Sequence, residues 1–143
     1  MTQPKGRVSV MLVEDDLAHA ELTLRSIEEL APELCEVVHV QDGQAALDHL
    51  RRAGASLPDL VLLDLRLPRM GGLEVLELVQ SDAELKQIPM VVLTTSDADD
   101  DRERALACGA SSYLVKPFGA PELLAVTRVL GCDSFSFPRA PTV

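Results

Sequence analysis

Short apolar runs alternate along the chain with longer stretches in which apolar residues recur at helical spacing. The first four runs are rich in Val and Leu and too short for ordinary helices, and they are typical of strands buried on both faces of a parallel sheet. A fifth, briefer run follows. The runs cover residues 8–13, 34–40, 60–63, 90–93 and 113–115. We therefore expect five strands.

The stretches between these runs carry signals for the start and end of helices. Asp16 is a candidate N-cap, and Pro32 follows the expected end of that helix. Four further helices are expected to begin at Asp42-Gly43, at Gly71-Gly72, at Ser96 or Asp97, and near Pro121. Strand and helix thus alternate five times, which predicts an α/β fold: a parallel sheet with right-handed crossovers and helices on both faces.

Length and composition narrow the class of protein. The chain has 143 residues, of which 47% are hydrophobic and 25% charged, which is typical of one globular domain. We expect that domain over residues 1–131 and a tail without an output domain over 132–143. The three cysteines are widely spaced, which favours reduced thiols, and no signal peptide or membrane span is visible. A cytoplasmic protein is expected.

Charge excludes two kinds of partner. Thirteen basic residues stand against 23 acidic ones, so the formal net charge is -10. Nucleic-acid phosphates and anionic lipids both need clustered Lys and Arg. We therefore expect neither a nucleic-acid partner nor a membrane partner.

Chemistry collects where the predicted strands end. Open α/β sheets place their sites beyond the carboxyl ends of the strands, and there stand Glu14, Asp15, Asp64, Thr94 and Lys116. Crowded carboxylates need a cation or raised pKa values, and a few carboxylates with waters suit Mg²⁺. A divalent ion, an ammonium and a hydroxyl around one carboxylate make a phosphoryl-transfer site. Asp64 would be its nucleophile, giving an aspartyl phosphate.

At these positions the sequence resembles the receiver domains of two-component response regulators. The matching segments are VEDD (13–16), LLDLRLP (62–68), VVLTTS (91–96) and YLVKPF (113–118), in the family's order and spacing. The resemblance covers about residues 8–130. It implies a flavodoxin-like doubly wound (βα)5 fold with strand order 2-1-3-4-5.

The resemblance also implies roles at the acidic site. Asp64 would accept a phosphoryl group from a sensor histidine kinase. Asp64, Asp15 and the backbone carbonyl of Arg66 would hold Mg²⁺ (or Mn²⁺), with Glu14 reaching the ion through water. The chain would be a signal transducer that promotes its own phosphorylation and slow dephosphorylation.

A switch is implied at the other strand ends. Thr94 would be the switch hydroxyl, Lys116 would contact the phosphoryl group, and Tyr113 would change rotamer with Thr94. The last two helices and the fifth strand would then present a different surface to a partner. The bond before Pro117 is often cis in the family. Arg66 and Ser96 stand where the family tunes hydrolysis, and we hypothesise that Arg66 slows loss of the phosphoryl group.

Two other functions stay open. An aspartyl-nucleophile phosphatase would need an acid two residues after Asp64, where Arg66 stands. An interaction module that takes no phosphate would not need the set of Asp64, Thr94 and Lys116. Within the family, the pattern that includes DGQAALDHL (42–50) is similar to single-domain regulators associated with bacterial phytochrome-type kinases. It favours a photosensory kinase as partner.

The remaining polar and aromatic residues have plainer interpretations. We expect His19, His39 and His49 to be solvated or packing residues, and Asp97 with residues 99–101 to stabilise a helix N-terminus rather than to bind calcium. Phe135 and Phe137 lie in the tail. They would fold back on the domain or reach a second subunit as a dimer arm.

Overall fold

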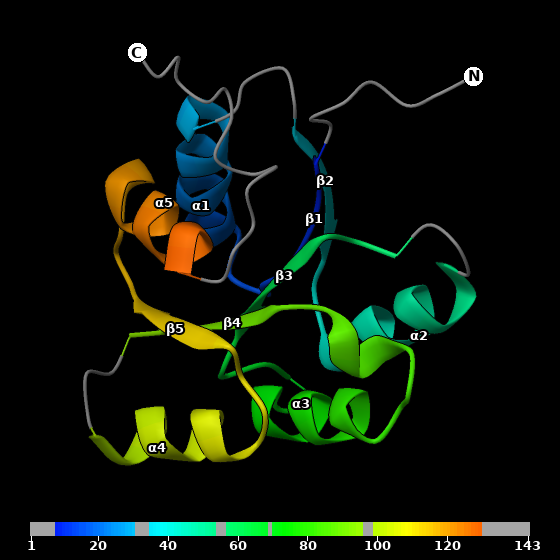
Figure 1. Cartoon of the computed structure of the whole chain (residues 1–143). Coiled ribbons are helices and arrows are strands. Elements are labelled where there is room, and N and C mark those ends of the chain that lie inside the picture. The colour runs from blue at the N-terminus through cyan, green and yellow to red at the C-terminus, as the bar shows by residue number, and fades with distance from the viewer. Residues whose placement is uncertain (1–7, 31–34, 54–56, 69, 96–98, 130–143) are drawn as a thin grey trace.

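The computed structural model describes residues 8–30, 35–53, 57–68, 70–95 and 99–129. In these ranges strands and α-helices alternate as predicted (Figure 1). The strands are β1 (Val8–Val13), β2 (Cys35–Val40), β3 (Leu60–Asp64), β4 (Met90–Thr94) and β5 (Ser112–Val115). The α-helices are α1 (Leu17–Leu30), α2 (Gly43–Ala53), α3 (Gly72–Gln80), α4 (Asp99–Ala107) and α5 (Ala120–Val129). A short 3₁₀ helix that we did not predict, η2 (Leu85–Gln87), precedes β4.

The five strands form one parallel sheet in the order β2-β1-β3-β4-β5. This order confirms the flavodoxin-like topology. It places β1 and β3 side by side, with Val13 opposite Leu63, so the residues that follow β1 lie next to the end of β3. After β1 the chain adds β2 on one side of it and then β3 on the other, so the topological switch point lies between β1 and β3. Ligands bind at such a switch point in open α/β sheets.

Each face of the sheet has its own hydrophobic core, because side chains alternate along every strand. Val10 and Leu12 of β1 pack in the core under α1 and α5. Met11 and Val13 of the same strand pack in the core under α2 and α3, to which α4 adds Ala105. Figure 1 shows these two layers, with α1 and α5 on one side of the sheet and α2, α3 and α4 on the other. Burial on both faces explains why the strands read as continuous apolar runs.

Two of the predicted helix starts are capped by aspartates. Asp16 Oδ1 accepts the backbone N–H of His19 at 3.0 Å, and this hydrogen bond is the main reason that the pKa of Asp16 is lowered. Asp42 Oδ1 accepts the N–H of Ala45 at 2.7 Å. Asp16 is therefore an N-cap, as expected. The expected caps of α4, Ser96 and Asp97, lie outside the described residues.

Gly72 is required by the close approach of α3 to the end of β3. A Cβ atom at this position would lie 2.6 Å from the carbonyl oxygen of Asp64 and 2.9 Å from the Cα of Leu65. Its neighbour Gly71 is the N-cap of α3 and makes no side-chain cap, and a Cβ there would meet nothing within 4 Å. Gly72 thus lets the first turn of α3 pack directly against Asp64 at the end of β3 and against Leu65, which follows it.

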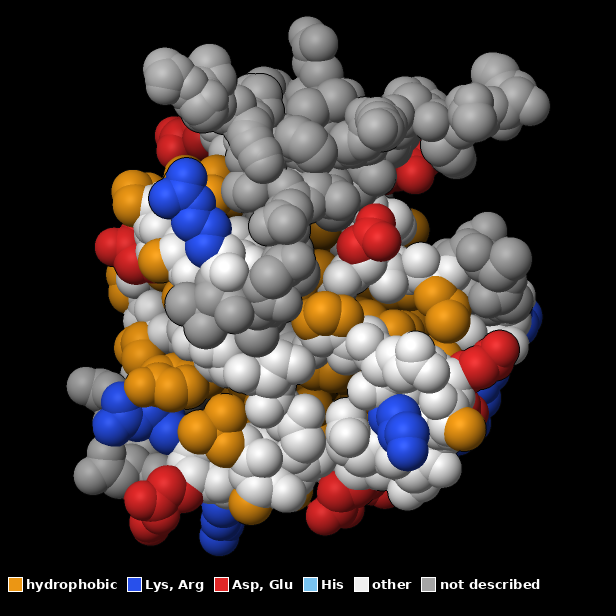
Figure 2. All heavy atoms as spheres, viewed as in Figure 1, with side chains coloured by type: hydrophobic (Ala, Val, Ile, Leu, Met, Phe, Trp, Pro, Cys, Tyr) orange, Lys and Arg blue, Asp and Glu red, His pale blue; other side chains and the backbone are white. Residues whose placement is uncertain are grey.

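Basic, acidic and hydrophobic side chains lie side by side on the surface seen in Figure 2. On the face seen in Figure 2, the Lys and Arg side chains drawn lie singly or in small groups among acidic and hydrophobic ones. Over the described ranges, none of the helices is long and apolar enough to cross a membrane. The tail with Phe135 and Phe137 lies outside the described residues, so both of its alternatives remain predictions.

Candidate functional site

The carboxyl ends of four neighbouring strands bring the predicted site residues to one edge of the sheet. Asp64 ends β3 and Thr94 ends β4, while Glu14 and Lys116 directly follow β1 and β5. The register aligns them, since Asp64 lies opposite Leu93 in β4. The N–H of Lys116 also donates to the carbonyl of Thr94 at 2.7 Å. Residues up to 102 positions apart in sequence therefore meet at this edge.

Three carboxylates form a compact acidic cluster here. Glu14, Asp15 and Asp64 each offer an oxygen, and these oxygens all lie within 4.8 Å of one another. Glu14 is fully buried and Asp64 is only 6% exposed, whereas Asp15 is exposed. Hard oxygen ligands at this spacing, with one side open to water, suit Mg²⁺ or Mn²⁺. The donor set therefore fits the metal that we expected.

Crowding and burial change the acidity of Asp64. Its pKa is raised from the ordinary 3.8 to about 6, first because burial disfavours the charged carboxylate and then because Glu14 lies beside it. Lys116 and the backbone N–H of Arg66 act in the opposite direction. That N–H donates to Asp64 Oδ1 at 3.2 Å. At neutral pH the carboxylate is ionised but held at an energetic cost.

Lys116 supplies the positive charge of the site. Its Nζ lies 2.7 Å from Glu14 Oε1 and 3.6 Å from Asp64 Oδ2, and its side chain is only 7% exposed. The ammonium is therefore hydrogen-bonded to Glu14 and forms a longer ion pair with Asp64. The peptide bond between Lys116 and Pro117 is cis, in agreement with the resemblance.

Two histidines that we expected to be solvated or packing residues contact the site. His39 Nε2 lies 2.8 Å from the backbone carbonyl oxygen of Glu14. His19 Nδ1 lies 3.0 Å from Lys116 Nζ. No spacing in the sequence signalled either contact, because each joins residues that are far apart along the chain, 25 positions for His39 and Glu14 and 97 for His19 and Lys116.

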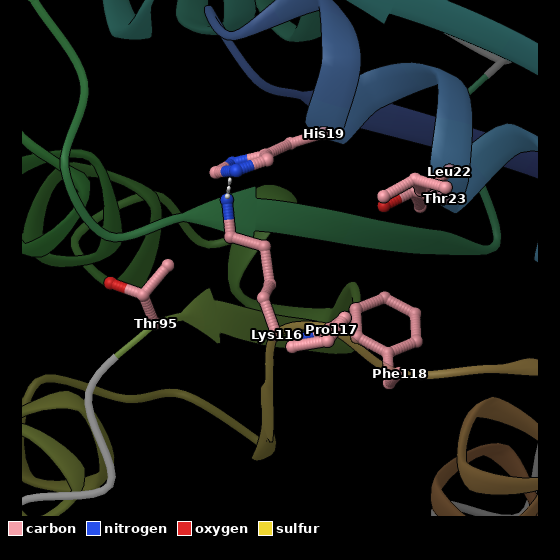
Figure 3. A pocket seen from close by; sticks show the side chains of 7 residues that line it. All are labelled: His19, Leu22, Thr23, Thr95, Lys116, Pro117 and Phe118. Atoms are coloured by element: carbon pink, nitrogen blue, oxygen red, sulfur yellow. Dashed lines mark hydrogen bonds between the residues drawn. The ribbon is translucent and has the colours of Figure 1, made fainter.

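A small pocket of about 210 Å³ opens beside Lys116. Figure 3 shows His19 reaching from α1 toward the ammonium of Lys116, with Pro117 and Phe118 following the lysine and Thr95 on the other side. Leu22 and Thr23 of α1 complete the lining. The walls of the pocket are largely hydrocarbon.

Of the two residues predicted to tune hydrolysis of the phosphoryl group, the structure describes Arg66. The guanidinium of Arg66 lies 3.9 Å from Asp101 Oδ2 of α4, and its side chain is largely exposed. Arg66 thus extends along the outside of the site. Ser96 lies outside the described residues.

The two predicted switch residues lie on one face of the sheet. Thr94 is buried, and the β4–β5 register places Val92 opposite Tyr113 and Thr94 opposite Val115. Arg102 of α4 donates a hydrogen bond to the Tyr113 hydroxyl, and its guanidinium carbon lies 5.1 Å from the centre of the ring. Tyr113 is therefore tied to α4, a contact that we did not predict.

Sequence comparison decides the family. Residues 10–128 match the response regulator receiver domain. This chain is a member of that family. Receiver domains are signal transducers that interact with sensor histidine kinases, and membership of this family accounts for the acidic cluster at the edge of the sheet.

Named relatives extend the comparison. The domain is 47% identical over 117 residues to the probable methanogenesis regulatory protein FilR2 of Methanothrix harundinacea, covering 80% of this chain and 75% of that protein. It is 39% identical over 123 residues to the response regulator MprA of Mycolicibacterium vanbaalenii, covering 86% of this chain. The match spans only 50% of the length of MprA.

Solved receiver structures share the fold. The bacteriophytochrome response regulator RtBRR superposes with a TM-score of 0.77 at 39% identity, covering 87% of this chain and 78% of that one. The phosphorylated cyanobacterial phytochrome response regulator RcpA gives 0.74 at 37%, covering 94% and 96%. The receiver domain of sensor histidine kinase PA1611 from Pseudomonas aeruginosa, with magnesium in its active-site cleft, gives 0.75 at 28%, covering 87% and 98%.

Proposed function

We propose that this receiver domain accepts a phosphoryl group on Asp64 from a sensor histidine kinase, with a divalent cation as cofactor. The observation that carries the proposal is the environment of Asp64. Two further carboxylates lie within 4.8 Å of it, and an ammonium lies 3.6 Å from its Oδ2. Burying several charged groups this close together costs folding free energy. Groups held at such a cost cluster at functional sites.

The cation would be Mg²⁺ or Mn²⁺, held by Asp15, Asp64 and the backbone carbonyl of Arg66. Glu14 would act through water, since its Oε1 is hydrogen-bonded to Lys116 and its Oε2 accepts the N–H of Asp16 at 3.2 Å. When bound, the ion would supply positive charge that stabilises the charge on the phosphoryl oxygens. The magnesium in the cleft of the PA1611 receiver supports this assignment.

The chain's own groups provide the nucleophile and its orientation. An Asp64 oxygen attacks phosphorus, the bond from phosphorus to the donor's histidine nitrogen breaks, and that nitrogen keeps the electron pair. Asp64 must be ionised to attack, which a pKa of about 6 permits at neutral pH. Lys116, whose Nζ lies 3.6 Å from Asp64 Oδ2, would neutralise charge on the transferred group.

The product would shift the domain between two shapes. An aspartyl phosphate adds charge and acceptor oxygens, which would draw Thr94 and Lys116 inward. Tyr113, on the same face of the sheet as Thr94, would follow and release its contact with Arg102 of α4. The surface made by α4, β5 and α5 would then differ between the two states and would bind a partner or a second copy of the chain.

A phytochrome-type photosensory kinase is the partner that we favour. RtBRR and RcpA are both phytochrome response regulators, at 39% and 37% identity over most of this chain. The sequence pattern of residues 42–50 favours the same type of kinase. Incubating the chain with such a kinase and radiolabelled ATP, in light and in darkness, would test the assignment.

Two other functions make different predictions. A phosphatase would need a general acid at position 66, and there the guanidinium of Arg66 pairs with Asp101. An interaction module would need no carboxylate cluster at all. Incubation with Mg²⁺ and acetyl phosphate, followed by intact mass, separates the three. An adduct abolished by EDTA and by Asp64→Asn supports our proposal, turnover of phosphate monoesters indicates a phosphatase, and no adduct indicates an interaction module.

A further inference from the structure

The ammonium of Lys116 makes two close hydrogen-bond contacts. A lysine ammonium has three N–H donors and no acceptor. Glu14 Oε1 lies 2.7 Å from Nζ and His19 Nδ1 lies 3.0 Å from it. Asp64 Oδ2, at 3.6 Å, is close but beyond an ordinary hydrogen bond. Two N–H groups of Lys116 thus donate to Glu14 and His19. The third is left for Asp64 or for a phosphoryl group bound to it.

The contact with Lys116 selects one tautomer of the His19 ring. Because Lys116 can only donate, His19 Nδ1 must carry a lone pair, and the proton of the neutral ring must be on Nε2. An imidazolium would place a second positive charge 3.0 Å from the ammonium. Asp16 Oδ2, at 3.9 Å from the same nitrogen, is too far for a hydrogen bond.

The surroundings make this contact effective. His19 and Lys116 share the pocket with the hydrocarbon of Leu22 and Phe118 (Figure 3), and water competes less for a donor beside such walls. A free lysine side chain has four flexible bonds, and ordering it costs entropy. A second acceptor on α1 reduces the freedom that Glu14 alone would leave.

We propose that His19 is a positioning residue: its unprotonated Nδ1 accepts a hydrogen bond from Lys116 and, with Glu14, holds the ammonium beside Asp64. The inference rests on the proposed function, since it places Lys116 for a phosphoryl group on Asp64. A cation bound at the acidic cluster would also attract the carboxylate of Glu14, which is one of the two acceptors of Lys116. The neutral imidazole does not bind it in this orientation and so remains an anchor for Lys116.

Nuclear magnetic resonance on the unphosphorylated, metal-free chain tests the contact itself. The chain has only three histidines and three lysines, so the ring and ammonium nitrogens can be assigned by single substitutions. We expect the proton of His19 on Nε2, and a slowly exchanging ammonium signal for Lys116 that exposed Lys86 lacks. A ring proton on Nδ1 of His19 would overturn the proposal.

Three variants then test the role. His19→Leu removes the acceptor, His19→Asn keeps an acceptor oxygen near the place of Nδ1, and His49→Leu on α2 is the matched control. We expect His19→Leu to lose the Lys116 signal and to slow phosphorylation by acetyl phosphate on the order of fivefold. His19→Asn should restore both, and His49→Leu should change neither.

The outcomes separate this inference from the proposed function. If the native chain is phosphorylated and His19→Leu keeps both the signal and the rate, the inference fails and the proposed function stands. Equal losses in His19→Asn and His19→Leu would also overturn it, because the acceptor would then not be the cause. If the native chain takes no phosphoryl group, the proposed function fails, and with it the role, while the spectrum still reports whether the contact exists.

Discussion

Asp64→Asn should make the metal-free domain more stable at neutral pH. The substitution keeps the size of the side chain and an acceptor for the N–H of Arg66, but it removes a charge that is buried beside Glu14. A tenfold change in proton affinity corresponds to about 1.4 kcal/mol. A pKa raised from 3.8 to about 6 therefore costs the folded state about 3 kcal/mol once the carboxylate is ionised.

The sign of this effect sets its pH dependence. Because the folded domain binds the Asp64 proton more tightly than the unfolded chain, the cost is absent below about pH 4, develops up to about pH 6 and is complete above it. Thermal unfolding in EDTA should show Asp64→Asn melting on the order of 10 °C higher at pH 7, with a margin that shrinks as the pH falls.

The matched control for this experiment is Asp48→Asn on the surface of α2. Asp48 accepts a hydrogen bond from Gln44, which asparagine can also do, so its effect should stay within a few tenths of a kcal/mol. An Asp64→Asn domain no more stable than the native one at pH 7, or a margin unchanged at pH 4.5, would refute the reasoning.

Three further predictions follow from the site's neighbours. Gly72→Ala should destabilise the fold by about 1–3 kcal/mol through overpacking against the end of β3, while Gly71→Ala, with open space around it, should cost less than about 1 kcal/mol; urea unfolding of both compares them. Arg66→Asn should shorten the lifetime of the phosphoryl group a few-fold, and an unchanged lifetime would defeat the shielding hypothesis. Arg102→Gln should loosen Tyr113 by about 1 kcal/mol and tighten binding of beryllofluoride roughly fivefold, read from the fluorescence of this single tyrosine; equal affinities would contradict it.

The fold and the edge that carries the site could be predicted because both depend on periodic, local signals. Runs of Val and Leu buried on both faces are incompatible with solvent-exposed strands, and Asp16 and Asp42 mark helix starts through bonds to residues three positions on. The carboxyl ends of parallel strands lie at one edge of the sheet, independently of the conformation of the loops. The position of Asp64 beside Glu14 follows from topology alone.

Contacts between side chains of distant elements could not be predicted in the same way. His19 and Lys116 are 97 positions apart, and their meeting depends on the rotamers of both and on how α1 packs on the sheet. Arg102 reaches Tyr113 for similar reasons. The stronger contact of Lys116 with Glu14 than with Asp64 also depends on geometry finer than the order of strands.

The central claim is that Asp64 carries the phosphoryl group, and locating the modification tests it most directly. The full chain is incubated with Mg²⁺ and acetyl phosphate and then reduced with borohydride, which converts an aspartyl phosphate to homoserine, and its peptides are sequenced by mass spectrometry. We predict homoserine at position 64 and nowhere else in the acidic cluster of Glu14, Asp15 and Asp64. Homoserine at position 15, or a chain without any reducible adduct, would contradict the account.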